Sequence, residues 1–94
     1  MSDTPQDPSL VRFLQQTVVL DTPGPMIYIG ILEAITAHYL ELREADVHDS
    51  NDSRATKELY IAETRDLGVR ANRACVLVAR HSVISLSLLS DVKE

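Results

Sequence analysis

The sequence predicts a mostly β fold with helices: a small, strongly bent five-stranded barrel with an N-terminal helix and a second helix inserted between strands three and four. Three observations predict it. Five short apolar or alternating segments are separated by turn residues. Gly30 interrupts the second segment, where a glycine often marks a sharp bend or bulge. Between the third and fourth segments, the chain instead has the spacing, cap and glycine stop of a helix.

The composition is that of one globular domain, with 94 residues, 45% of them hydrophobic and 24% charged. No apolar run approaches the roughly 20 residues of a membrane span, and the polar, acidic start does not resemble a secretory signal. The single cysteine, Cys75, cannot form an internal disulfide, so a cytoplasmic location is expected. The net charge of −5 argues against a broad basic surface, so any nucleic-acid site must be local or repeated by symmetry.

The first part of the chain is expected to contain a tail, a short helix and two strands. Residues 1–8 hold two prolines and no periodicity, which is typical of a disordered tail. Ser9 can cap a helix that places Leu10, Phe13 and Leu14 on one face. The strands are expected at 17–21 and 26–35, joined by the turn 22–25.

The middle of the chain is expected to form a strand, a polar loop and a helix. Residues 36–38 make a tight connection to a strand over 39–47, in which apolar and polar residues alternate. The loop 48–52 leads to a helix over 54–67, with Ser53 as its cap and Gly68 as its stop. Its apolar stripe, expected to dock onto the barrel, consists of Ala55, Leu59 and Ala62.

The last part of the chain is expected to contain two strands, at 74–80 and 83–89, and a polar tail over 90–94. Residues 9–89 then form a single domain, with the helical insertion at about 53–68. The two final strands are strongly apolar and lie at the open edges of so short a barrel. An exposed apolar edge is an aggregation hazard unless it is paired, so self-association is expected.

Two segments resemble the motifs of the Sm-like proteins. The first, from Gly30 to Leu42, has a strand glycine, apolar alternation, a tight turn and a second alternating strand. The second, from Val76 to Ser85, has an apolar strand, a basic turn and a short apolar strand. Its Arg80-His81 pair matches the Lys-His step of the bacterial Hfq type, to which the pattern is closest, although Hfq has only a short turn where this chain has a helix. The resemblance covers roughly residues 9–47 and 74–89.

The resemblance implies an SH3-like, Sm-like barrel that forms a homo-oligomeric ring, a hexamer or heptamer, by pairing strand four of one subunit with strand five of the next. It also implies that the two tight turns face the pore. The candidate RNA-binding residues are then Thr36, His38, Arg80 and His81. Arginine can pair with phosphate and histidine can stack on a base, and symmetry would repeat both around the pore. Thr36 stands where the family usually has an acid, and His38 and Ala79 stand where it usually has aromatic residues.

Other residues that could carry chemistry are expected to be structural. The stretch 46–52 holds oxygen donors and His48, but it lacks the spacing of a calcium loop and is expected to be a polar connector. His38 and His81 have no identifiable nucleophile or orienting carboxylate beside them, so an enzyme is not expected, nor is a cofactor or metal. Cys75 is expected to be a core residue. Tyr28 and Tyr39 are expected to pack, with an outer face of the ring as the alternative for Tyr28.

Two functions remain open on the sequence alone. The first is an RNA-binding ring, which the motif resemblance and the basic turn favour. The second is a scaffolding ring that makes protein contacts without RNA, which the acidic total and the absence of Trp favour. In this second interpretation, the turn residues are ordinary solvated residues. Both interpretations have the chain itself as partner, and neither involves a membrane.

Overall fold

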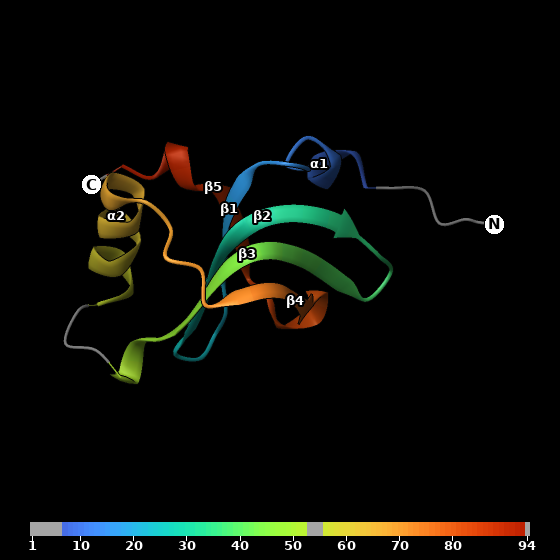
Figure 1. Cartoon of the computed structure of the whole chain (residues 1–94). Coiled ribbons are helices and arrows are strands. Elements are labelled where there is room, and N and C mark those ends of the chain that lie inside the picture. Colours follow the sequence, from blue (N-terminus) through green and yellow to red (C-terminus); the bar gives the residue numbers. More distant parts are fainter. Residues whose placement is uncertain (1–6, 53–55, 94) are drawn as a thin grey trace.

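The computed structural model describes residues 7–52 and 56–93, which form one antiparallel sheet with helices at its ends (Figure 1). The strand order is β4-β3-β2-β1-β5, so β4 and β5 are the two edges. The predicted fold class is confirmed, including the helix between β3 and β4. The strands are β1 (Thr17–Asp21), β2 (Met26–Ile35), β3 (Tyr39–Asp49), β4 (Arg73–Ala79) and β5 (Ser85–Leu88). The helices are α1 (Pro8–Val11) and α2 (Lys57–Leu67), with 3-10 turns η1 (Ser50–Asp52), η2 (Arg80–Ser82) and η3 (Leu89–Asp91).

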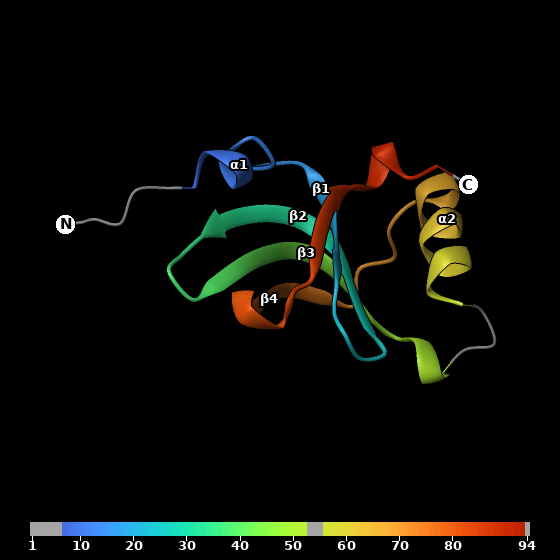
Figure 2. The ribbon, with the colours of Figure 1, turned by 180° about the vertical axis from the view of Figure 1, so that it is seen from behind.

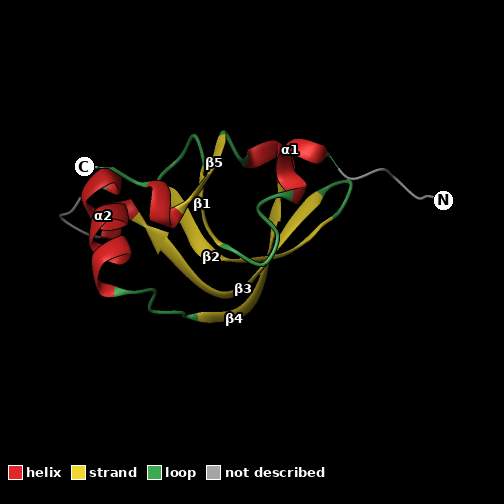
Figure 3. Cartoon of the chain, turned by 90° about the horizontal axis from the view of Figure 1, so that it is seen from above, coloured by secondary structure: helices red, strands yellow, loops and turns green. Residues whose placement is uncertain are grey.

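The sheet is curved (Figure 3), and the strand pairing is irregular on either side of Gly30, where the sequence predicts a bend or bulge. The pairing of β2 with β3 shifts register between Ile29 and Ile31 and again between Leu32 and Ala34. A Cβ atom at Gly30 would lie 2.9 Å from the Cβ and 3.0 Å from the Cα of Ala45, on the facing strand. Glycine is therefore required here because the two backbones approach too closely for a side chain.

Both faces of the sheet bury apolar side chains. Val18 and Leu20 point into the larger cluster, with Leu32, Leu42 and other residues of β2–β4. Val19, between them, points the other way into a second cluster. This alternation explains why β1 is apolar at three successive positions: each of its faces meets a core. The second cluster consists of Val19, Ile27, Ile29, Ile61 and Leu89, and α2 and η3 supply its last two members.

The inserted helix is confirmed, but it begins at Lys57, later than predicted. Thr56 is its N-cap and accepts a hydrogen bond from the backbone N–H of Leu59, at 3.1 Å. The predicted cap, Ser53, lies outside the described residues, as does Ala55 of the predicted stripe. Gly68 ends the helix with a φ of +98°, as the predicted glycine stop requires.

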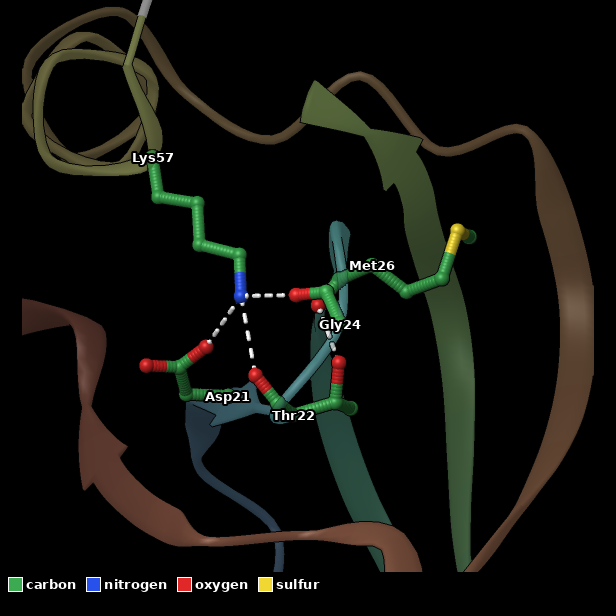
Figure 4. Close-up of polar contacts among 5 residues, drawn as sticks. All are labelled: Asp21, Thr22, Gly24, Met26 and Lys57. Carbon is green, nitrogen blue, oxygen red and sulfur yellow. Dashed lines mark hydrogen bonds and ion pairs between the residues drawn. The ribbon is translucent and has the colours of Figure 1, made fainter. Parts of the chain in front are cut away.

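The predicted docking face of this helix is wrong. Leu59 is 52% exposed, and the buried residues of α2 are Ile61 and Thr64. Polar anchoring explains the rotation. The ammonium group of Lys57 binds the carboxylate of Asp21, at 2.8 Å, and the carbonyl oxygens of Thr22 and Gly24, at 2.9 and 2.6 Å (Figure 4). Lys57 lies on the same face as Ile61 and Thr64, so this contact turns Leu59 outward.

Three smaller predictions need correction. Asp7, not Ser9, is the N-cap of α1: its carboxylate accepts a hydrogen bond from the backbone N–H of Ser9, at 2.9 Å. Cys75 is exposed because β4 is an edge strand and the face of Cys75 and Leu77 lies away from the core. Tyr39 is 44% exposed, whereas Tyr28 packs against the larger core cluster as predicted. Residues 1–6 of the predicted tail lie outside the described part of the chain.

The molecule is elongated, with extents of 46 × 23 × 22 Å. α2 and the C-terminal segment lie at one end, and α1 and the turn between β2 and β3 lie at the other (Figures 1 and 2). Within the described residues, no helix has the length and apolar character needed to cross a membrane. The two ends of the fold therefore present different surfaces, and the predicted site residues belong to the end opposite α2.

Candidate functional site

The turn between β2 and β3 is closed by Thr36. Its backbone N–H donates a hydrogen bond to the carbonyl oxygen of Tyr39, at 2.9 Å, and its side-chain oxygen accepts one from the backbone N–H of Tyr39, also at 2.9 Å. A short threonine side chain can satisfy its own turn in this way. Ala37 and His38 lie between these residues and are exposed. Thr36 therefore shapes the turn, and His38 is displayed on it.

The turn after β4 is the 3-10 segment η2, Arg80–Ser82. The backbone N–H of Val83 donates to the carbonyl oxygen of Arg80, at 3.1 Å, and the hydroxyl of Ser82 donates to the carbonyl oxygen of Ala79, at 2.8 Å. His81 is exposed on this turn, whereas Arg80 is half-buried. The last two predicted strands leave residues 81–82 between them, and the observed turn is one residue longer because Arg80 belongs to it.

The structure brings the two turns together. Tyr39 pairs with Ala79 at the ends of β3 and β4, so the turns that adjoin these residues are neighbours. The backbone N–H of Arg80 donates to the carbonyl oxygen of His38, at 2.8 Å, and its Nη1 donates to the carbonyl oxygen of Thr36, at 2.7 Å. We refer to Thr36, His38, Arg80 and His81 as the turn cluster. All four were predicted to lie together.

The turn cluster borders an open depression of about 440 Å³, lined by Ala37, His38, Arg80 and His81. None of these lining residues is acidic, although the whole chain carries a charge of −5. The hydrogen bond to Thr36 uses one guanidinium N–H group of Arg80, and within the described chain no other side-chain hydrogen bond of Arg80 is formed. A locally cationic, hydrogen-bonding depression is therefore present at this end of the fold.

One acidic residue near the turn cluster was missed by the sequence reasoning. Hydrogen bonds from Ser9 hold the pKa of Asp7 below its ordinary value, and the positive charge of Arg80 lowers that pKa further, by less. Asp7 is therefore close enough to Arg80 to offset part of its charge. The Asp-Pro step at residues 7–8, which is typical of a helix start, was the signal that could have placed Asp7 beside the domain.

The stretch 46–52 is part of the fold and not a free connector. β3 continues to Asp49, and His48 stacks on the ring of Tyr60 from α2, with centroids 3.8 Å apart. The hydroxyl of Tyr60 donates to the carboxylate of Asp46. Burial raises the pKa of Asp46, while His48 acts in the opposite direction. Within the described residues, no group of three or more His, Cys, Asp or Glu side chains could hold a metal ion.

Cys75 does not have the environment of a reactive thiol. Desolvation, followed by the hydrogen bond and charge of the nearby Glu41 carboxylate, raises the pKa of its thiol. A raised pKa leaves less thiolate, which is the nucleophilic form. Cys75 is thus neither the core residue that was predicted nor a candidate nucleophile.

Comparisons with known proteins identify the fold. No protein-family model matches the chain, and no curated protein matches it in sequence. Among solved structures, the Sm protein of Pyrococcus abyssii in complex with a uridine heptamer is 15% identical, with 86% of this chain and 93% of that chain covered and a TM-score of 0.59. A chain of the NatC complex bound to CoA is 19% identical, with 93% and 88% covered and a TM-score of 0.56.

The chain has an Sm-like fold. In this Sm-like fold, the turn cluster lies where the β2–β3 and β4–β5 connections meet. The edge strands β4 and β5 do not pair with each other within the chain, and each edge exposes a large apolar side chain. Leu77 on β4 is 55% exposed, and Ile84, next to β5, is 63% exposed. The Sm-like chain therefore presents two separate strand edges that are open to other chains.

Proposed function

We propose that this protein is a non-enzymatic Sm-like subunit that assembles into a homo-oligomeric ring and binds single-stranded RNA at the turn cluster. The observation that carries the proposal is the pair of hydrogen bonds from Arg80 to Thr36 and His38. These bonds join two turns from distant parts of the chain into one cationic, solvent-open cluster. The similar Pyrococcus Sm protein was solved with a uridine heptamer, which supports RNA as the ligand class.

Ring assembly follows from the two open edges. A chain with β4 at one edge and β5 at the other can pair each edge with the opposite edge of a neighbour. Such a head-to-tail contact generates a closed ring when the rotation between subunits closes, here proposed as a hexamer or heptamer. Pairing also removes the two unpaired edges that would otherwise invite aggregation. It would cover Leu77 and Ile84, the exposed apolar residues beside these edges.

The turn cluster has the chemistry for RNA. The guanidinium of Arg80 can form charge-assisted hydrogen bonds to phosphate oxygens, and the exposed rings of His38 and His81 can stack on unpaired bases. We therefore propose weak binding that depends on the single permanent charge of Arg80 in each chain and that weakens further with salt. The Arg80-His81 step is the basis for favouring the Hfq type within the Sm-like fold.

The test is a titration of fluorescent U-rich and A-rich RNA heptamers, at two salt concentrations, with the parent chain and two variants. The parent is expected to bind at low salt. Arg80→Ala is expected to lose binding while its oligomeric state is unchanged. Arg70→Ala removes the same charge from an exposed position near the end of α2 and is expected to bind like the parent. If the parent binds neither RNA, or if Arg80→Ala binds as well as the parent, the RNA proposal fails.

A scaffolding ring without RNA is the second candidate. The net charge of −5 and the proximity of Asp7 to Arg80 favour it, because both weaken the attraction for a polyanion. The similarity to a chain of the multi-protein NatC complex also supports protein contacts as the role. Absence of RNA binding by an intact ring would select this candidate. For either role we propose a cytoplasmic location, in keeping with the single free Cys75.

A further inference from the structure

The helix α2 exposes apolar side chains that the fold leaves uncovered. Leu59 is 52% exposed and Leu67 is 82% exposed. They lie eight residues apart, which is about 12 Å along a helix axis. The side of α2 that faces the sheet carries Lys57, Ile61 and Thr64, so the two leucines belong to the outward side. We call Leu59, Glu63, Asp66 and Leu67 the outer face of α2.

The charge of this outer face is negative because the carboxylate of Glu63 is not balanced: Arg65 pairs with Asp66, the other carboxylate of the face, and Lys57 is held on the inner side. The ammonium of Lys57 is held by Asp21 and two carbonyl oxygens of the β1–β2 turn (Figure 4). The guanidinium of Arg65 donates to the carbonyl oxygen of Val92, at 2.6 Å, and to the carboxylate of Asp66. Glu63 is exposed, and no ion pair of its own is found among the described residues.

A groove runs beside the last turns of this helix. It has a volume of about 230 Å³ and is lined by residues of α2, by Gly68 and Arg70 after the helix, and by Asp46 of β3. Its charged lining residues are Asp46, Glu63 and Arg70, which together leave one negative charge. Asp46 accepts hydrogen bonds from Tyr60 and Asn72, and these contacts hold its carboxylate in place. The groove can therefore receive one long side chain, and its charge favours a cation.

The sign of the charge selects the occupant. A second copy of the same face would bring acidic residues against acidic residues, which opposes pairing. A nucleic acid or an anionic membrane surface would be repelled for the same reason. A segment with apolar residues along one side and lysine or arginine on its flanks matches both the exposed leucines and the acidic surroundings.

We propose that the outer face of α2 and the adjoining groove form a docking surface for a basic, amphipathic helical segment of another protein. Apolar residues of the segment cover Leu59 and Leu67, and a lysine or arginine enters the groove between Glu63 and Asp46. This surface lies at the end of the molecule opposite the turn between β2 and β3 (Figure 2). The proposal does not rest on RNA binding or on ring formation, and a ring with inward-facing turns would leave it accessible.

The test uses the full chain and a synthetic amphipathic helix of leucine and lysine, about 14 residues and therefore about 21 Å long. A peptide with the same leucines and with glutamate in place of lysine is its control. Fluorescence anisotropy is expected to show saturable binding of the leucine–lysine peptide, about tenfold or more tighter than that of the leucine–glutamate peptide. No difference between the two peptides would overturn the proposal.

Three variants separate a docked complex from general attraction to an acidic chain. Glu63→Lys and Leu67→Ser are each expected to weaken peptide binding by about tenfold. Glu33→Lys makes the same change of charge at an exposed position near the end of β2 that leads into the β2–β3 turn, and it is expected to change affinity by less than about twofold. Equal losses for Glu63→Lys and Glu33→Lys, or unchanged binding by Leu67→Ser, would contradict a specific surface. Far-UV circular dichroism checks that each variant folds.

Discussion

The guanidinium of Arg80 donates a hydrogen bond to the carbonyl oxygen of Thr36, at 2.7 Å, across 44 residues of sequence. The same side chain supplies the permanent positive charge of the turn cluster. Arg80 therefore has two separable roles: it holds the turn between β2 and β3 against η2, and it offers guanidinium N–H groups to an anion. Substitutions of the Thr36 side chain keep this carbonyl acceptor and the charge of Arg80, and they test how the turn between β2 and β3 is itself closed.

Thr36→Val is expected to lower the free energy of unfolding by about 1 kcal/mol, because the backbone N–H of Tyr39 loses the side-chain oxygen that accepts its hydrogen bond. Thr36→Ser keeps that oxygen and is the matched control, with stability near that of the parent. Urea unfolding followed by circular dichroism measures both. If Thr36→Val and Thr36→Ser unfold at the same urea concentration, the hydroxyl does not shape the turn.

Gly30→Ala is expected to destabilise the fold by about 1–3 kcal/mol, the usual range for overpacking. The added Cβ would lie 2.9 Å from the Cβ of Ala45, on one of the most buried parts of β3. Moving β2 and β3 apart at this point is energetically unfavourable because it would disturb the packed core. Gly24→Ala is the control, since nothing lies within 4 Å of a Cβ there. Equal unfolding midpoints for the two variants would show that close packing does not require glycine at position 30.

Gly68→Val is expected to cost about 1 kcal/mol or more, for a different reason. A Cβ at Gly68 would meet nothing within 4 Å, so no clash contributes. The cost is the φ of +98°, which side-chain-bearing residues rarely adopt. Chemical denaturation compares Gly68→Val with Gly68→Ala. The alanine variant has the same unfavourable positive φ and is expected to lose most of the same free energy of unfolding. A gain in stability from either substitution would mean that the helix ends differently in solution.

Asp46 gives the protein a specific pH dependence. Burial raises the pKa of Asp46 above 3.8 in the folded chain, with an opposing effect from His48. A folded state that binds this proton more tightly than the unfolded state is favoured at low pH. The contribution is present below pH 3.8 and is lost as pH rises through the folded pKa.

Asp46→Asn removes this titration. Relative to Asp46→Asn, the parent is therefore expected to lose stability as pH rises from about 4 toward neutrality. Urea unfolding of both chains at several pH values measures the difference. Parallel curves over that range would show that Asp46 is as solvated in the folded chain as in the unfolded one.

The sequence was sufficient for elements defined by local signals. Alternation and turn residues predicted β1 and β2 with their observed bounds, because the Pro-Gly-Pro turn and the 36–38 connection delimit them. Gly68 predicted the end of α2 for the same kind of reason. The start of α2 was harder, because both Ser53 and Thr56 are suitable caps. Only the packing of the helix selects between them.

The sequence did not predict how α2 is oriented, because that orientation depends on contacts between residues that are far apart in the chain. An apolar stripe through Leu59 looked like the docking face, but Lys57 and Tyr60 are anchored by Asp21 and Asp46, and these polar contacts turn the helix. Hydrophobic periodicity does not include such contacts. The meeting of the two turns likewise depends on the β3–β4 pairing, and it was predicted only through the resemblance to Sm-like proteins.

Sedimentation velocity of the full chain at micromolar concentration tests the central claim, that the open edges β4 and β5 pair between subunits to close a ring. The predicted result is a single species with the mass of a hexamer or heptamer. Placing a charge on the exposed edge residue, as in Leu77→Asp, is expected to shift it toward the monomer. A parent chain that sediments as a stable monomer at these concentrations would contradict the claim.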